Sequence, residues 1–292
     1  MTEGVGRRIV LALLVLSWAI SWPVIKVGVA TVPPLWYACF RYWIATTCLF
    51  TLAAARRRVT LPPRSDWPLV VVSGVLQMAA YSALTGLALM ILPPGRASVL
   101  AFSTPIWVVP LGAWWLREHA SQRTLLGVAL GTVGILAIAA PSLRAGRAEE
   151  TFAYAMLLGA AAAWAVSIVA VRAHRFIATP LALAPWQMLV AGCLLLPAAL
   201  LVEGAPQPMT TSGAASLAYV GPVATAFAYW AVVEVGRKVR ASTISTALLA
   251  APSLGILISA ETLGETVGPS LVAGGVLVGV GIRLVTTAPL RM

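Results

Sequence analysis

Long apolar segments alternate with short polar connections along the whole chain. Ten of these segments can cross about 30 Å of hydrocarbon as a helix that rises about 1.5 Å per residue. They cover residues 9–31, 34–55, 67–92, 97–116, 124–140, 152–171, 180–202, 213–233, 241–260 and 267–286. The first follows Arg7 and Arg8, but it is too long for a signal peptide and lacks a small-x-small exit. The pattern therefore predicts an all-α integral membrane protein with ten transmembrane helices.

The second five segments repeat features of the first five at a spacing of 146 or 147 residues. The matched pairs are Trp18 with Trp164, Pro34 with Pro180, Ser98 with Ser245, Pro105 with Pro252, and Glu118 with Glu265. One spacing that holds over several segments indicates an internal repeat. Because each repeat has an odd number of segments, the second must enter the membrane in the opposite sense. We therefore expect two inverted five-helix repeats, residues 1–146 and 147–292.

The composition excludes a soluble globule. The chain is 60% hydrophobic and 10% charged, so its apolar surface must face a lipid bilayer. A net charge of +11 would favour nucleic acid as the partner of a soluble domain, but here the basic residues lie in short connections between apolar segments. They are interpreted as determinants of topology, and no nucleic-acid partner is expected.

The basic residues are distributed unevenly between the two ends of the predicted helices. With the N-terminus inside, only Lys26, Arg96, Arg144 and Arg147 lie in outer segments, and Arg41 lies within a span. The other fifteen of the twenty are inside: Arg7, Arg8, Arg56, Arg57, Arg58, Arg64, Arg117, Arg123, Arg172, Arg175, Arg237, Lys238, Arg240, Arg283 and Arg291. The positive-inside rule then places both termini in the cytoplasm and predicts a multi-pass protein of the inner membrane.

Aromatic and small polar residues share one face of the first and sixth segments. Trp18, Ser21 and Trp22 follow helical spacing on the first, and Trp164 and Ser167 do so on the sixth. The two central tryptophans lie about halfway along their segments, away from the interfaces where aromatic anchors are common. They indicate the wall of a substrate cavity, with helix packing as the alternative.

Strongly polar residues on other segments point to the same cavity. Gln77 and Tyr81 form a polar stripe on the third segment, and Tyr229 lies on its counterpart, the eighth. A glutamine that faces lipid is costly, so these residues are expected to face a substrate or to form hydrogen bonds between helices. Arg41 is well inside the second segment, where it can bind a substrate carboxylate or else pair with backbone carbonyls.

The fourth and ninth segments each carry a serine followed seven residues later by a proline. Ser98 precedes Pro105, and Ser245 precedes Pro252. A proline inside a helix removes a backbone hydrogen bond, and such broken helices often flank the central site of a transporter. We interpret the prolines as hinges, with simple packing kinks as the alternative. Phe102 lies one turn beyond Ser98 and is expected to share its face.

Pairs of glycines four residues apart mark the fifth and tenth segments. Gly127 and Gly131 form one pair, and Gly275 and Gly279 form the other. Such pairs usually allow helices to pack closely within one chain. A monomer is therefore expected, although a dimer seam at these positions is an alternative.

The predicted interior lacks the groups that catalysis or direct energy coupling would need. Every acidic residue maps to a terminus, a connection or the end of a segment, and both histidines lie in inner connections. This arrangement predicts no metal site, no enzymatic activity and no proton relay. No glycine-rich loop with a lysine is present to bind ATP, and no cofactor is expected. Secondary transport remains, and we favour a facilitator that runs down its substrate gradient.

These motifs resemble those of the drug/metabolite transporter superfamily in its EamA-type, ten-helix branch. The resemblance rests on the two five-segment repeats, the paired tryptophans, Arg41, the two prolines and the ending Gly264-Glu265, for which the first repeat has Arg117-Glu118. The aromatic-rich first and third segments further resemble YddG-type exporters. The resemblance implies an exporter of aromatic and other neutral amino acids that works by alternating access. Exporters of other small metabolites or of cationic aromatic drugs, and a membrane scaffold that transports nothing, are the alternatives.

Overall fold

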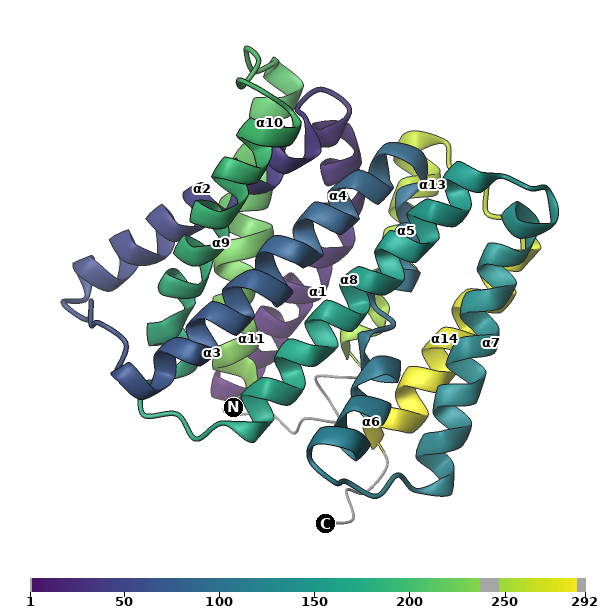
Figure 1. Ribbon diagram of the computed structural model, residues 1–292, viewed down its shortest axis with the longest axis horizontal. Coiled ribbons are helices and arrows are strands. Elements are labelled where there is room, and N and C mark those ends of the chain that lie inside the picture. Colours follow the sequence, from purple (N-terminus) through teal and green to yellow (C-terminus); the bar gives the residue numbers. More distant parts are fainter. Residues whose placement is uncertain (1, 237–246, 288–292) are drawn as a thin grey trace.

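The computed structural model describes residues 2–236 and 247–287 of the chain. These residues form a bundle of helices (Figure 1). The α-helices are α1 (Thr2–Val29), α2 (Pro34–Ala55), α3 (Trp67–Val72), α4 (Tyr81–Ile91), α5 (Pro94–Ala101), α6 (Thr104–Trp115), α7 (Gln122–Arg144), α8 (Ala148–Ala173), α9 (Pro180–Val202), α10 (Thr211–Tyr219), α11 (Ala228–Gly236), α13 (Ala250–Leu263) and α14 (Pro269–Thr287). A 3-10 turn, η1 (Arg64–Asp66), precedes α3, and two π-helical segments, η2 (Ser73–Ala80) and η3 (Val220–Phe227), continue α3 and α10.

Nine helical stretches among the described residues are long and apolar enough to cross a membrane. Three of them join several elements: 64–91 contains α3, η2 and α4, 94–115 contains α5 and α6, and 211–234 contains α10, η3 and most of α11. The predicted ninth segment lies partly outside the described residues, and its described part includes most of the shorter apolar helix α13. The prediction of an all-α integral membrane protein is confirmed, whereas the inverted repeat and the side of each terminus stay predictions.

Three spans depart from a continuous α-helix. The π-helical segments η2 and η3 begin 147 residues apart and are both eight residues long. Between α5 and α6 the helix breaks at Phe102 and Ser103. Pro105 therefore lies in the first turn of a new helix and does not kink a continuous one, because a proline fits where no backbone donor is needed. Pro252 likewise lies in the first turn of α13.

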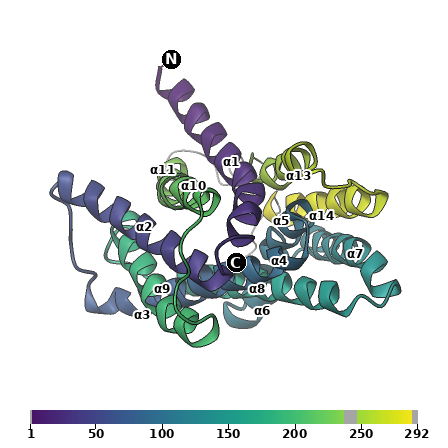
Figure 2. The same cartoon turned by 90° about the horizontal axis from the view of Figure 1, so that it is seen from above.

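Helices α7 and α14 pack along their whole lengths at one edge of the bundle (Figures 1 and 2). A Cβ atom on Gly134 would lie 2.6 Å from the carbonyl oxygen of Gly274, and one on Gly127 would lie 2.7 Å from that of Gly281. The backbones of the two helices are thus nearly in contact. The expected pair of Gly275 and Gly279 is not part of this seam, since a Cβ atom on either would meet nothing within 4 Å.

Helices α2 and α9 pack together at the opposite edge, and α1, α4, α5, α8 and α13 lie between the two edges (Figures 1 and 2). Carboxylates tie sequence-distant helices at their ends. Glu203, after α9, accepts hydrogen bonds from the backbone N–H groups of Leu35 and Trp36 at 2.9 and 3.0 Å. Glu265, before α14, does the same for Gly95 and Arg96 at 2.8 and 3.3 Å. Both caps satisfy donors that a helix start leaves unpaired.

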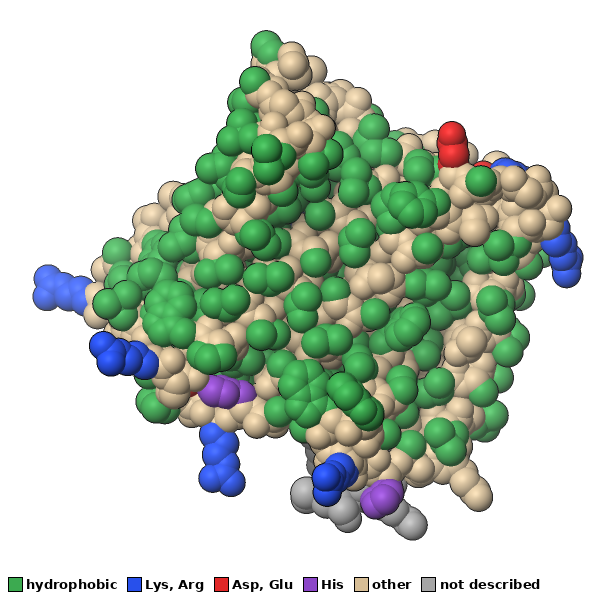
Figure 3. All heavy atoms as spheres, viewed as in Figure 1, with side chains coloured by type: hydrophobic (Ala, Val, Ile, Leu, Met, Phe, Trp, Pro, Cys, Tyr) green, Lys and Arg blue, Asp and Glu red, His purple; other side chains and the backbone are tan. Residues whose placement is uncertain are grey.

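Apolar side chains cover the face of the molecule shown in Figure 3, and charged side chains lie around its margins. Large hydrophobic side chains are exposed, for example Leu201 at 86% and Trp114 at 79%. Such a surface would be unfavourable in water, and it fits a protein whose flanks are solvated by lipid.

Candidate substrate-binding cavity

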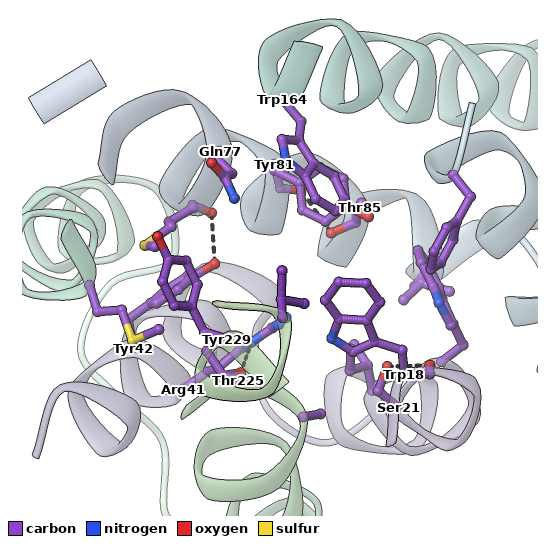
Figure 4. Close-up of a pocket in the computed structure, with 18 residues that line it drawn as sticks. Trp18, Ser21, Arg41, Tyr42, Gln77, Tyr81, Thr85, Trp164, Thr225 and Tyr229 are labelled. Atoms are coloured by element: carbon purple, nitrogen blue, oxygen red, sulfur yellow. Dashed lines mark hydrogen bonds between the residues drawn. The ribbon is translucent and has the colours of Figure 1, made fainter. Parts of the chain in front are cut away.

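A cavity of about 160 Å³ lies in the centre of the bundle, between helices from both halves of the chain (Figure 4). Nine of the twelve residues predicted to bind substrate line it: Trp18, Ser21, Trp22, Arg41, Gln77, Tyr81, Phe102, Trp164 and Tyr229. They come from seven elements: α1, α2, η2, α4, α8, α11 and the break between α5 and α6. Their role in binding stays a prediction, but the structure brings them together around one space.

Aromatic rings form one wall of the cavity. The Trp164 ring meets the Tyr81 ring edge to face, with centroids 5.1 Å apart, and meets the Trp18 ring at 6.4 Å. Phe102 extends the wall, with its centroid 6.0 Å from that of Trp18. Each pair is close to perpendicular or steeply tilted, which is a favourable geometry for aromatic quadrupoles. The wall therefore offers ring faces and edges to an apolar or aromatic ligand.

Arg41 provides a positive charge on the other side of the cavity. Its Nε donates a hydrogen bond of 2.7 Å to Thr225 Oγ1, and its guanidinium lies 5.6 Å from the centroid of the Tyr42 ring. Thr225 in turn donates to the carbonyl oxygen of Val220, five residues earlier in the π-helix, at 2.8 Å. No other charged residue lines the described cavity, so its field favours a negatively charged group.

Gln77 supplies an amide whose orientation is fixed by a hydrogen bond from Ser167, a residue that does not line the cavity. Ser167 donates to Gln77 Oε1 at 3.2 Å, and the hydroxyls of Ser167 and Ser73 also lie 3.2 Å apart. The Gln77 amide nitrogen has no hydrogen-bond partner among the described residues, and Figure 4 shows the side chain directed toward the open space. Tyr229 lies on the same side of the cavity and donates to Gln187 Oε1 at 2.8 Å.

Two of the predicted residues in the described part of the chain do not line the cavity. Ser98 is fully buried and donates to the carbonyl oxygen of Gly95 at 2.8 Å, so its hydroxyl is used within its own helix. Ser167 is also fully buried and acts on the cavity only through Gln77. Ser245 lies outside the described residues.

The structure adds polar residues that sequence reasoning did not place in the site. Thr85 lines the cavity one helical turn beyond Tyr81, so an extension of the stripe formed by Gln77 and Tyr81 would have found it. Tyr42 follows Arg41 directly, and its hydroxyl lies 2.8 Å from that of Ser82. Successive residues of a helix are turned about 100° from each other, so the position of Arg41 alone gave no signal for Tyr42.

The described part of the chain offers no arrangement typical of a metal centre. Within 2–236 and 247–287, no three His, Cys, Asp or Glu side chains lie close enough together to hold a metal ion. What the cavity does offer is a cationic group, an amide and an aromatic wall. This combination suits a small molecule that has a carboxylate at one end and an apolar or aromatic body at the other.

Comparisons with known proteins agree on one class of membrane protein. The EamA-like transporter family matches the chain twice, over residues 8–140 and 151–287. An uncharacterized transporter of Bacillus subtilis, YvbV, is 26% identical over 96% of this chain and 91% of its own length. A probable terminal-alkyne amino-acid exporter of Streptantibioticus cattleyicolor is 29% identical over 94% of this chain and 91% of its own length.

A probable amino-acid metabolite efflux pump of Salmonella typhimurium is 28% identical over 93% of this chain and 92% of its own length. Among solved structures, one crystal structure of a protein superposes with a TM-score of 0.65 over 96% of both chains. Its sequence identity of 22% makes it informative about the fold alone.

Proposed function

Because this chain belongs to the EamA-like transporter family, we propose that it exports aromatic and other neutral amino acids across the inner membrane by alternating access. One observation carries the substrate class: the guanidinium of Arg41 and the rings of Trp18 and Trp164 line the same cavity of about 160 Å³. An apolar cavity of about 150 Å³ accommodates benzene, so this one has room for a single aromatic ring.

Each part of an amino acid has a partner in this proposal. The carboxylate binds the free edge of the Arg41 guanidinium, whose Nε is already held by Thr225. The side chain packs against Trp18 and Trp164. The Gln77 amide nitrogen, which faces the open space, donates a second hydrogen bond to the carboxylate. The ammonium group donates to the hydroxyl oxygen of Thr85, whose own proton is donated to the carbonyl oxygen of Tyr81.

Transport in this proposal is a rocking of the two repeats, 1–146 and 147–292, around the cavity. The arginine-rich end of the bundle faces the cytoplasm, in accord with the predicted topology. Pro105 and Pro252 act as hinges in the first turns of α6 and α13, and Pro105 lies next to the break between α5 and α6. The direction, export, is supported by relatives named as an amino-acid exporter and an amino-acid metabolite efflux pump.

The proposed transporter is a facilitator. No carboxylate lines the described cavity, so substrate binding there involves no acidic group that must gain or lose a proton. The same charge distribution disfavours cationic aromatic drugs, because Arg41 would repel a cation beside the tryptophans. A scaffold without transport activity would need no polar-lined cavity around Gln77 and Tyr81, so the space found there argues against that alternative.

Reconstituted protein in liposomes provides the test. Vesicles preloaded with radiolabelled phenylalanine or leucine should release them faster than protein-free vesicles, and the release should not follow an imposed proton gradient. Absence of transport for every neutral amino acid would refute the substrate class. Uphill accumulation driven by the proton gradient alone would refute the facilitator.

A further inference from the structure

A second cavity opens at the edge of the bundle, between the end of α2 and the start of α9. Its volume is about 310 Å³, and none of its lining residues lines the central cavity. Arg56 and Arg58, which follow the last residue of the α2 span, form its rim. The cavity therefore lies where a bilayer changes from hydrocarbon to headgroups, at the arginine-rich end of the molecule.

The apolar part of this cavity is held in place by specific contacts. The Trp186 indole donates to the carbonyl oxygen of Thr60 at 3.0 Å, and its ring meets the Phe50 ring edge to face with centroids 5.0 Å apart. These contacts join α2, α9 and the connection after α2. Leu49, Leu181 and Ala182 complete the apolar walls. Because these contacts hold the Trp186 ring against one wall, an open apolar slot remains between α2 and α9.

The rim carries positive charge that no ion pair with a described residue neutralises. Arg56 and Arg58 are exposed, and neither forms an ion pair or a side-chain hydrogen bond with any other described residue. The start of α9, at Pro180, lies at the same rim and adds the positive end of a 23-residue helix. An apolar slot beneath an uncompensated cationic rim is complementary to an amphiphile with an anionic head.

The other end of the same helix pair serves as an internal comparison. There a cavity of only about 10 Å³ remains beside the stacked rings of Trp36 and Phe40, and its described lining includes no charged residue. Packing of α2 against α9 does not by itself leave a slot. The open cavity and the arginines occur together, at one end only.

We propose that an anionic phospholipid of the cytoplasmic leaflet occupies this second cavity. Its phosphate binds Arg56 and Arg58, and one acyl chain follows the slot between Leu49 and Leu181. Figure 3 shows basic side chains at the left edge of the molecule beside an apolar surface, where Figure 1 places the connection from α2 to α3. The lipid would link α2 to α9 from outside the protein.

Native mass spectrometry of the full-length protein tests the proposal, with phosphatidylglycerol and phosphatidylcholine as the two probes. Phosphatidylglycerol should bind to the wild type in preference to phosphatidylcholine. The double substitution R56Q/R58Q should weaken phosphatidylglycerol binding about thirtyfold, since two arginines near an anionic headgroup are removed. The matched control is R57Q/R64Q, which removes the same charge from the same end of the molecule at positions that do not line the cavity.

A second variant separates the slot from general electrostatic attraction. Ala182→Phe fills the slot without a change of charge and should abolish the phosphatidylglycerol preference; Ala53→Phe fills it from α2 if the first variant does not fold. Equal binding of the two lipids, an equal loss in R57Q/R64Q, or displacement of the lipid by inorganic phosphate would overturn the proposal. So would a dimer that disappears in Ala182→Phe, since a second copy of the chain would then be the occupant.

Discussion

The Nε of Arg41 donates a 2.7 Å hydrogen bond to Thr225 Oγ1, so a residue of the second half of the chain holds the charged side chain of the first half. The terminal nitrogens of the guanidinium have no hydrogen-bond partner among the described residues. Arg41 is therefore oriented on one edge and free on the other. A bound carboxylate would complete its hydrogen bonds without a rearrangement of the side chain.

Replacement of Arg41 by lysine should weaken transport of substrates with a free carboxylate. Lysine keeps the charge but loses both the bond to Thr225 and the planar edge that binds a carboxylate bidentately. We expect a rise in KM of about tenfold to a hundredfold, since a hydrogen bond to a charged group contributes about 1.5–3 kcal/mol. Thr225→Val keeps the guanidinium and should have a smaller effect. Equal loss for the amide of the same amino acid would show that Arg41 does not bind the carboxylate.

Replacement of Trp164 by leucine should reduce the preference for aromatic over aliphatic amino acids. Trp164 touches both Tyr81 and Trp18, so its loss opens the aromatic wall. A ring pair contributes about 0.5–1.5 kcal/mol beyond its area, which corresponds to about two- to tenfold in relative transport of phenylalanine and leucine. Trp114→Leu is the matched control, because Trp114 is 79% exposed on the outer surface. An unchanged phenylalanine-to-leucine ratio would exclude ring contacts as the source of selectivity.

The two buried serines should differ when each is replaced by alanine. Ser167→Ala removes the donor that holds Gln77 Oε1, so the amide can rotate and transport should fall several-fold, since one neutral hydrogen bond contributes about 1 kcal/mol. Ser98→Ala removes only a bond to a carbonyl of the same helix and should leave KM unchanged. Transport assays on the two variants, with expression and thermal stability matched, make the comparison. A loss in Ser98→Ala as large as in Ser167→Ala would contradict this assignment.

Alanine should be tolerated at one glycine of α14 and not at its neighbour. In Gly274→Ala the new Cβ atom would lie 2.6 Å from the carbonyl oxygen of Gly134, so α7 and α14 must move apart. We expect a loss of about 1–3 kcal/mol in the free energy of unfolding, as for other overpacked sites. Gly275→Ala meets nothing within 4 Å and should be neutral or slightly stabilising, since alanine is a better helix former. Thermal unfolding of both variants in detergent tests this prediction. Equal melting temperatures would contradict the close packing of α7 against α14.

Glu265 should make stability depend on pH. Burial raises the pKa of its carboxyl group above the ordinary value, although the backbone N–H groups of Gly95 and Arg96 oppose the shift. The folded protein thus binds this proton more readily than the unfolded chain. Its contribution to stability is present in full below the ordinary pKa near 4.5 and is lost as the pH rises through the raised pKa.

The variant E265Q isolates this contribution. It keeps one acceptor for the start of α5 and removes the titration. The melting temperature of the wild type relative to E265Q should therefore rise as the pH is lowered from about 8 to about 5. A difference that stays constant over this range would show that Glu265 does not titrate with a raised pKa.

Hydropathy alone predicted where nearly all the described helices lie, because a segment that crosses lipid must satisfy its backbone internally and hide its polar groups. The same reasoning found the aromatic wall, since Trp18 and Trp164 lie about halfway along their segments, away from the interfaces where tryptophans usually anchor a helix. It did not find that Ser98 forms a hydrogen bond within its own helix. The position of a serine along a helix does not show whether its hydroxyl faces a cavity or binds the backbone of the preceding turn. It also chose the wrong glycines on α14: Gly274 and Gly281 form the seam, and spacing cannot tell which of several small residues a neighbour approaches.

A hydropathy pattern based on 3.6 residues per turn also could not predict the π-helical segments η2 and η3. A π-helix has a wider turn, so it behaves like an α-helix that contains an extra residue. The wider turn takes up this extra residue, so the residues that follow η2 keep the rotational phase that an α-helix shorter by one residue would give them. If residues 73–80 formed a regular α-helix without a deletion, Tyr81 would turn by about 100° away from Trp164. The aromatic wall thus depends on the wide turn of η2 as much as on the identity of its residues.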